Sequence, residues 1–245
     1  MQSKRACSSA LLLGLPAMLI FSEAVSASLL APGTTLPPDI FSACPGCTLE
    51  ASLNSGPITV SNGQGITLTF DALSAVYADP SNPFGAGRLD FVYQLANLSG
   101  GNDFIGRVTA GVFSGFMTDV GFTATGSALP GGLFVNGTQA PQLVSRSATV
   151  PNNGATVGFI YNALAPSTFA PGTTSTALII QTDATNFKAG NVNLIDDVVG
   201  STAAFEPATP VPLPGTFLLL LLGVAGLAVL GLGGRGSDAT LLASG

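Results

Sequence analysis

The sequence predicts an all-β protein, an antiparallel and jelly-roll-like β-sandwich, carried between an N-terminal signal peptide and a C-terminal transmembrane helix. Short runs in the middle of the chain alternate apolar and polar side chains, as half-buried strands do. Turn-forming pairs such as Asn62-Gly63 and Pro171-Gly172 separate these runs, which is typical of sandwiches and barrels. Outside the two ends, no long run repeats its apolar residues at the period of a helix.

The individual strands follow from this alternation. Ile66, Leu68 and Phe70 share one face of the first clear run, and Phe91, Tyr93 and Leu95 share one face of the next. The apolar run at 177–182 is continuous, which indicates a central strand. The predicted strands lie at residues 66–71, 89–96, 107–113, 120–125, 143–150, 155–161, 177–182 and 198–205.

The composition excludes several classes of function. Charged residues make up only 8% of the 245 residues, against about a quarter in ordinary soluble domains. The basic residues between the ends (Arg88, Arg107, Arg146 and Lys188) form no basic cluster, so we expect no nucleic-acid binding. The chain has no histidine to serve as the base of a serine hydrolase, and no Ser-x-x-Lys motif includes Lys188. We therefore expect no enzymatic activity.

The first 27 residues have the pattern of a Sec-type signal peptide. Lys4 and Arg5 form a positive start, residues 10–21 form an apolar stretch, and Val25-Ser26-Ala27 offers small residues for cleavage. We expect cleavage after Ala27, with the exported domain covering residues 28–209. The alternative is an uncleaved anchor, for which the apolar stretch is short.

The other end of the chain has a second apolar segment. Residues 217–234 carry no charge, and as a helix rising 1.5 Å per residue they just span a hydrocarbon layer of roughly 30 Å. A proline-rich linker, 210–216, precedes this segment. Arg235 begins a short tail, 235–245, which we expect in the cytoplasm, with the β domain on the other side of the membrane.

The linker, the apolar segment and the basic residue after it resemble the PEP-CTERM sorting domain of diderm bacteria. The resemblance implies processing by a membrane protease-transpeptidase, an exosortase. Leu213 stands where the usual motif has Glu, and a single Arg replaces the usual basic cluster. The alternative is a plain transmembrane anchor without processing. The matching residues are Val211, Pro212, Leu213, Pro214, Gly215, Thr216 and Arg235.

Short blocks of the middle domain also resemble exported PEP-CTERM proteins of unassigned function. This resemblance covers roughly residues 60–205 and implies a shared domain without a known activity. Association with the family implies co-export with exopolysaccharide, which is an analogy. The blocks are residues 91–94, 113–116, 118–121, 145–147, 156–159 and 179–184.

Cys44-Pro45-Gly46-Cys47 is the sharpest local motif. Pro and Gly at its centre are the residues of a type II turn, which brings the flanking Cα atoms within about 7 Å and so permits a disulfide. Cys7 leaves with the signal peptide, so we expect a Cys44–Cys47 clip. A thioredoxin-like role would require a helix start, and a zinc site would require further Cys or His ligands. We expect no metal and no cofactor, and no calcium loop is present among the scattered aspartates.

Two hypotheses of function follow. The first is a non-enzymatic protein of the cell surface or extracellular matrix, anchored in the inner membrane before processing and released to the surface or outside afterwards. The second is a carbohydrate-binding module for exopolysaccharide. It would need exposed aromatic rings from Tyr77, Tyr93 or Tyr161, although the last two fit a core face better. Buried tyrosines would favour the first hypothesis, a non-enzymatic surface or matrix protein.

Overall fold

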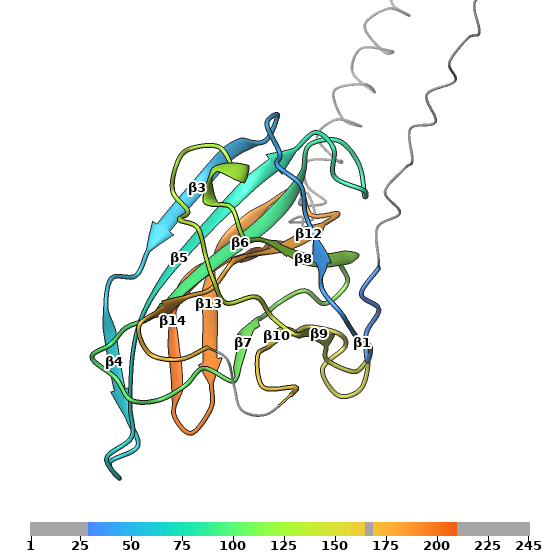
Figure 1. Ribbon diagram of the computed structural model, residues 1–245. Coiled ribbons are helices and arrows are strands. Elements are labelled where there is room, and N and C mark those ends of the chain that lie inside the picture. The colour runs from blue at the N-terminus through green and yellow to red at the C-terminus, as the bar shows by residue number, and fades with distance from the viewer. Residues whose placement is uncertain (1–28, 165–168, 210–245) are drawn as a thin grey trace, which may run out of the picture.

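A computed structural model describes residues 29–164 and 169–209, and these residues form an all-β structure, as the sequence predicts (Figure 1). The predicted signal peptide (1–27), the predicted sorting motif (210–216), the apolar segment (217–234) and the predicted tail (235–245) lie outside the described residues. Within the described ranges, no helix is both long enough and apolar enough to cross a membrane.

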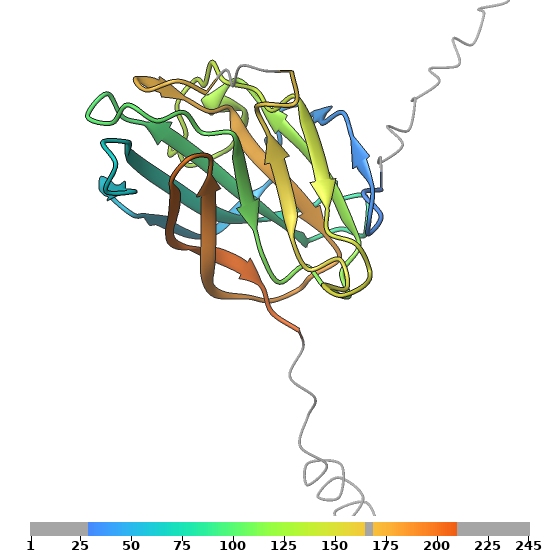
Figure 2. The same cartoon turned by 90° about the horizontal axis from the view of Figure 1, so that it is seen from below.

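The strands belong to two sheets. The larger sheet has the order β2-β8-β12-β6-β5-β3, with β4 paired to β5 and β11 paired to β6. The smaller has the order β1-β9-β10-β7-β13-β14, which Figure 2 shows from the orange β13–β14 hairpin through green β7 to yellow β10 and β9. The bounds are β1 Thr35–Leu36, β2 Asp39–Ile40, β3 Thr48–Asn54, β4 Ile58–Ser61, β5 Thr67–Asp79, β6 Arg88–Asn97, β7 Arg107–Ala110, β8 Thr118–Thr123, β9 Leu143–Arg146, β10 Val157–Ile160, β11 Thr173–Thr174, β12 Ala177–Thr182, β13 Phe187–Ile195 and β14 Val199–Pro207.

One edge of the larger sheet departs from the expected antiparallel pattern. Strand β2 pairs with β8 in parallel, with Asp39 opposite Gly121. The expectation of a wholly antiparallel sandwich is therefore wrong at this edge. The chain crosses from β1 in the smaller sheet through Pro37-Pro38 to β2 in the larger one, and a crossover of this kind permits parallel pairing where a tight hairpin does not. Gly121 allows the close approach, because a Cβ there would collide with the Asp39 carbonyl.

The facing sides of the two sheets share one apolar core. Phe70, Phe91 and Tyr93 enter it from the larger sheet, and Val108 and Phe159 enter it from the smaller one. All these side chains are almost completely buried. The predicted faces of residues 89–96 and 155–161 are thus confirmed as core faces.

The end of β14 is fixed to the opposite sheet by two side chains. The Tyr93 hydroxyl donates a hydrogen bond to the Phe205 carbonyl at 2.7 Å, and the Phe205 amide donates to Ser74 Oγ at 3.0 Å. The Phe205 ring packs edge-on against Phe187, with 5.4 Å between ring centres. The last described strand is therefore held both by its hairpin partner and across the core.

A second, smaller apolar cluster covers the outer side of the larger sheet. Tyr77, Val92 and Ile179 pack there against Leu129 and Phe134 from the segment between β8 and β9. This segment is attached to the sheet by paired hydrogen bonds between the Gln94 side chain and the backbone of Val135, at 2.8 and 3.0 Å. Cover on both faces explains the continuous apolar run of β12, which lies at the predicted residues 177–182.

The sequence prediction missed β3 and β13. Neither strand presents a continuous buried face: the side chains of β3 alternate between exposed and partly buried, and the first half of β13 is not fully buried. β13 is instead specified by its partner, because it pairs with β14 over its whole length, from Phe187 to Ile195. The residues Leu49, Ala51 and Leu53 of β3 alternate with polar ones, so periodicity could have predicted this strand, whereas the first half of β13 shows no such face.

Arg146, at the end of β9, is a buried cation, with 5% of its surface exposed. A guanidinium has five N–H donors, and here they go to four backbone carbonyls and one hydroxyl. Burial without these acceptors would be very costly for a charged group. The acceptors are Gly154 O at 2.8 Å, Leu30 O at 3.2 Å, Thr118 Oγ1 at 3.1 Å, Phe113 O at 2.7 Å and Phe116 O at 2.8 Å.

We predict that Arg146→Met lowers the free energy of unfolding by about 3 kcal/mol or more, because buried carbonyls lose their donor. Urea denaturation followed by fluorescence or circular dichroism measures this change. Arg88→Met, at a partly exposed position on β6, serves as the control. A loss below about 1 kcal/mol for Arg146→Met would contradict the assigned role.

Candidate functional site

The structure contains a disulfide between Cys44 and Cys47, with Cα atoms 5.4 Å apart. The turn is closed by a hydrogen bond from the Cys47 amide to the Cys44 carbonyl at 3.2 Å. The expected type II geometry is wrong, since Gly46 is not among the residues with positive φ. A Cβ at Gly46 would lie 3.1 Å from Cγ of Pro80, so a larger residue would require the proline ring to shift by a few tenths of an ångström.

Strand β3 begins directly after Cys47, at Thr48. A thioredoxin-like dithiol lies at the start of a helix, whose amide groups stabilise the thiolate. Here the following residues form an extended strand, so this stabilisation is missing at Cys44. The local structure favours a structural disulfide between the N-terminal arm, residues 29–44, and the start of β3 in the larger sheet.

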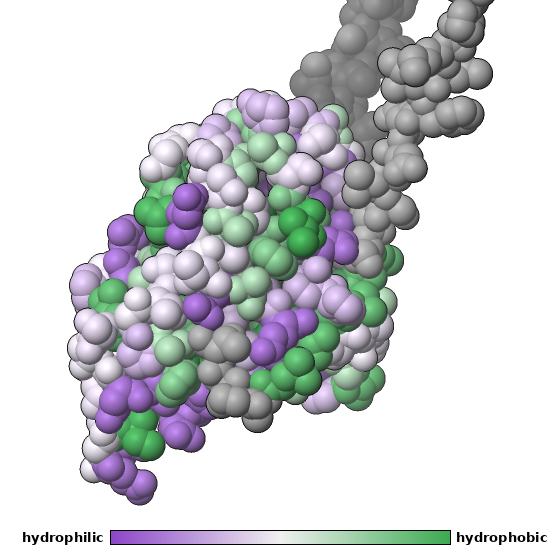
Figure 3. All heavy atoms as spheres, viewed as in Figure 1, coloured by the Kyte–Doolittle hydropathy of each residue, from purple (hydrophilic) through white to green (hydrophobic). Residues whose placement is uncertain are grey.

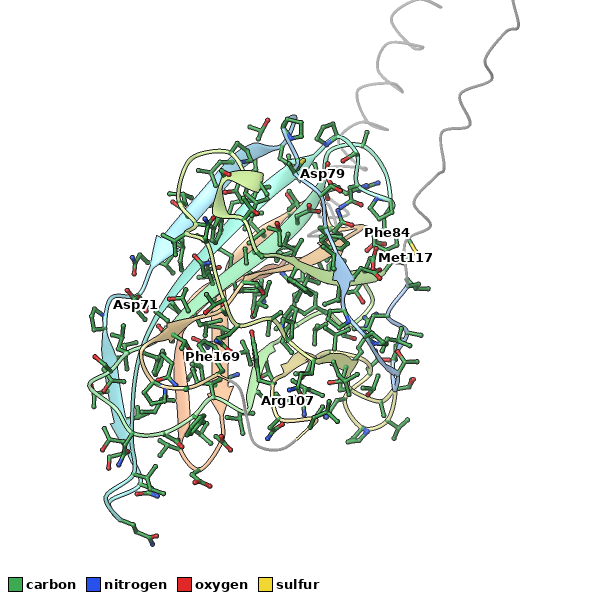
Figure 4. The ribbon with its side chains drawn as sticks, viewed as in Figure 1. Asp71, Asp79, Phe84, Arg107, Met117 and Phe169 are labelled. Carbon is green, nitrogen blue, oxygen red and sulfur yellow. A yellow bond between two sulfur atoms is a disulfide. The ribbon has the colours of Figure 1, made fainter. Side chains whose placement is uncertain are left out.

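The carboxylate of Asp79 lies beside the disulfide, at the end of β5 (Figure 4). Its Oδ1 is 3.3 Å from Sγ of Cys44, a contact rather than a hydrogen bond because a disulfide sulfur carries no proton. The same oxygen accepts from the Ser81 amide at 2.7 Å and the Ser81 hydroxyl at 2.6 Å. Oδ2 accepts from Nε2 of Gln181 at 3.1 Å. The carboxylate is therefore held in a fixed orientation.

Asp90 on β6 brings a second buried carboxylate to this place. It accepts from Nδ2 of Asn82 at 2.9 Å and, more weakly, from Nε2 of Gln181 at 3.4 Å. The Gln181 amide thus bridges the two carboxylates. Burial, followed by the nearby charge of Asp79, raises the pKa of Asp90 to about 8, against the lowering effect of the two amide donors. Asp90 is accordingly mostly protonated at neutral pH.

A cavity of about 200 Å³ opens next to these groups. Ile179 and Leu129 contribute apolar walls, and Cys44, Asp79 and Asp90 contribute the sulfur and carboxylate oxygens. At about 30 Å³ per molecule, such a volume accepts a few waters or one small polar ligand. The cavity combines an anionic corner with an apolar floor, so it suits a cation or a small hydrogen-bond donor better than an anion.

In the sequence the aspartates look scattered. The hairpin between β5 and β6 brings two of them, Asp79 and Asp90, together. Asp90 lies opposite Tyr77 in the ladder, so it is a diagonal neighbour of Asp79. The turn signals at Pro80 and Pro83, combined with strands on both sides, could have revealed this pairing. Asp71, also on β5, lies far from the site (Figure 4).

A second carboxylate group lies near the start of β14. Asp103 is buried, and its Oδ2 accepts from the Val198 amide at 3.1 Å. Burial is the main cause that raises the pKa values of Asp103 and Asp196, with a further contribution from the charge of Asp197. The hydrogen bond joins the segment between β6 and β7 to the turn between β13 and β14, which indicates a structural role.

All three tyrosines are buried: Tyr77 and Tyr161 are 0% exposed and Tyr93 is 1% exposed. The Tyr77 hydroxyl donates to the Pro130 carbonyl at 2.9 Å, and burial raises its pKa to about 12. The hypothesis that these rings form an exposed sugar-stacking platform is therefore wrong. On the face seen in Figure 3, apolar residues occur as separate groups among polar ones.

Comparisons with protein-family models, with curated proteins and with solved structures give no match for this chain.

We predict that the disulfide-bonded protein loses stability as the pH rises from about 4 to about 8. Asp90 keeps its proton across this range when folded and loses it near pH 4 when unfolded, so the folded state binds the extra proton. The free energy of unfolding should fall by an amount on the order of a few kcal/mol. Denaturant titrations across this pH range measure the change in the free energy of unfolding. The chain has no histidine that would titrate within the range.

The variant Asp90→Asn should reduce this dependence to the part that Asp103 and Asp196 contribute, because the asparagine side chain cannot ionise. Asp71→Asn, which changes a partly buried carboxylate outside the site, should leave it in place. Parallel slopes for the unmodified protein and for Asp90→Asn would show that Asp90 is ionised in the folded state, contrary to the prediction.

Proposed function

We propose that this chain is a non-enzymatic protein of the cell surface or extracellular matrix, exported by the Sec pathway. The observation that carries the proposal is the order of its C-terminal features: the Val211–Thr216 motif, the apolar residues 217–234 and Arg235. Together they resemble the PEP-CTERM sorting signal. The N-terminal pattern of residues 1–27 supports the same route, since export must precede sorting at the outer side of the membrane.

In this proposal the apolar segment first holds the protein in the inner membrane. An exosortase-type enzyme then processes the chain near Pro212-Leu213-Pro214, and the β domain continues to the cell surface or the surrounding matrix. A polysaccharide of that surface is a proposed partner through the family resemblance alone. The finer description of the fold as a jelly-roll-like sandwich belongs to the same proposal, supported by two sheets that share one core.

The described residues offer support for a structural role. The carboxylates of Asp79 and Asp90 are bound by internal donors, and every donor of Arg146 has an acceptor. Such hydrogen bonds hold these side chains in one conformation, as a structural role requires. The alternative of a carbohydrate-binding module is weaker, because the three tyrosines proposed to stack on sugars lie inside the protein.

We predict that unprocessed protein stays in the membrane fraction after a carbonate wash, because 217–234 is long and apolar enough to span the bilayer. Leu222→Arg, near the middle of the segment, should cost roughly 3 kcal/mol of insertion energy and move protein to the soluble fraction or to degradation. Leu241→Arg, in the tail, is the matched control and should leave fractionation unchanged. Full-length protein that washes off with carbonate would contradict both the sorting and the anchor interpretations.

We predict a mature N-terminus at Ser28 and, in a host with an exosortase, a C-terminus near residues 212–214. Mass spectrometry of the protein from its native host measures both ends. Deletion of the exosortase should restore the longer C-terminal form, because the apolar segment is then retained. If the apolar segment is retained both with and without the exosortase, the plain transmembrane anchor is the correct interpretation. A retained Met1 would contradict the prediction of a cleaved signal peptide.

A further inference from the structure

Three potential metal ligands converge at the disulfide turn. The sulfur atoms of Cys44 and Cys47 and a carboxylate oxygen of Asp79 all lie within 4.8 Å of one another. In the disulfide the sulfurs are not thiolates and cannot act as anionic ligands. Reduction would change their chemistry, while the short turn and strands β3 and β5 would still hold the three residues near one point.

We propose that the reduced chain binds a thiophilic divalent cation such as Zn²⁺ through Cys44, Cys47 and Asp79. A dithiol reductant transfers two electrons and two protons to the disulfide, which becomes two thiols while the reductant becomes a disulfide. The cation then displaces both thiol protons to solvent and binds the two thiolates and one carboxylate oxygen. The site is absent from the oxidised chain, so disulfide formation and metal binding exclude each other.

The third ligand distinguishes this site from a bare pair of cysteines. Zinc accepts carboxylate oxygens together with thiolates, and three protein ligands with an open fourth position are a common arrangement. Cys44 and Asp79 line the cavity of about 200 Å³, from which water could reach a metal bound to them. The sequence could not supply Asp79 as a ligand, since it lies 35 residues from Cys44.

The surroundings of Asp79 are those of an oriented ligand. Ser81 donates to Oδ1 through its amide and its hydroxyl, and Gln181 donates to Oδ2. Such bonds from neighbouring groups fix the direction of a metal-binding carboxylate. Asp79 is also 98% buried, since only 2% of its surface is exposed, so its orientation is not averaged by solvent.

Electrostatics favour a bound cation over free thiolates at this place. The Asp79 carboxylate, 3.3 Å from Sγ of Cys44, would repel a free thiolate there. No helix start offsets this repulsion, because Cys47 leads directly into β3. A divalent cation placed between the three groups replaces repulsion by attraction, which is why the reduced turn should hold a metal rather than act as a redox catalyst.

The test uses the full chain in detergent, with Cys7→Ser in every variant so that Cys44 and Cys47 are the only thiols. The protein is compared in the oxidised form and after reduction by a phosphine under anaerobic conditions. Competition with a chromogenic chelator should show one Zn²⁺ per reduced chain and none per oxidised chain. Co²⁺ should give thiolate-to-metal charge-transfer absorption in the reduced form only. Equal binding by both forms, or no cobalt band after reduction, would overturn the proposal.

The variant Asp79→Asn should weaken Zn²⁺ binding by about tenfold or more, whereas Asp71→Asn, on the same strand, should bind as the parent does. Unchanged affinity in Asp79→Asn would show that the thiolates alone hold the metal and would overturn the three-ligand site. If circular dichroism shows that Asp79→Asn does not fold, the stoichiometry and the cobalt spectrum of the parent decide. A stoichiometry of one metal per two chains would equally overturn the site, because it indicates bridging between molecules.

Discussion

The interaction on which the rest of this structure depends is the capture of Arg146 by backbone carbonyls. A buried guanidinium tolerates no missing acceptor, so the segments that supply the carbonyls must occupy defined positions around it. Leu30 in the N-terminal arm and Thr118 at the start of β8 are two of these points. β8 in turn pairs with β2, and the arm continues from β2 to the disulfide turn. The segment that carries Cys44 to the cavity beside Asp79 is thus continuous with one that Arg146 holds.

The chain contains few ionisable side chains and places several of them inside. Asp79, Asp90, Asp103 and Arg146 are all at least 95% buried, because their exposed fractions are 2%, 4%, 4% and 5%. Each is held by hydrogen bonds from or to other segments. Apolar packing alone tolerates many arrangements of similar volume, whereas a buried charge tolerates few. The buried ionisable groups therefore specify how the loops are placed, while the aromatic and aliphatic side chains supply most of the stability.

The all-β class and the core strands could be predicted from the sequence because they depend on local alternation. Phe91 and Tyr93 on β6 and the apolar run of β12 show burial directly. β13 is less visible in this way, since its first half is only partly buried or exposed. β3 does alternate Leu49, Ala51 and Leu53 with polar residues, but the sequence prediction missed this short signal. The cysteine pair was visible as a motif, but its neighbour Asp79 depended on the register of the β5–β6 hairpin. Spacing along a sequence records neighbours on one strand, and the site is built from neighbours across strands.

The attachment of Phe205 has a mechanical consequence. β14 is the last described strand and lies at the edge of the smaller sheet, so a pull on the chain beyond residue 209 loads it first. An edge strand held only by its hairpin would peel away one ladder bond at a time. Here the side chains of Tyr93 and Ser74 form hydrogen bonds with the backbone of Phe205, two residues before the strand ends. Tension is therefore passed across the core to the long strands β5 and β6, and several bonds must rupture together before the domain begins to unravel.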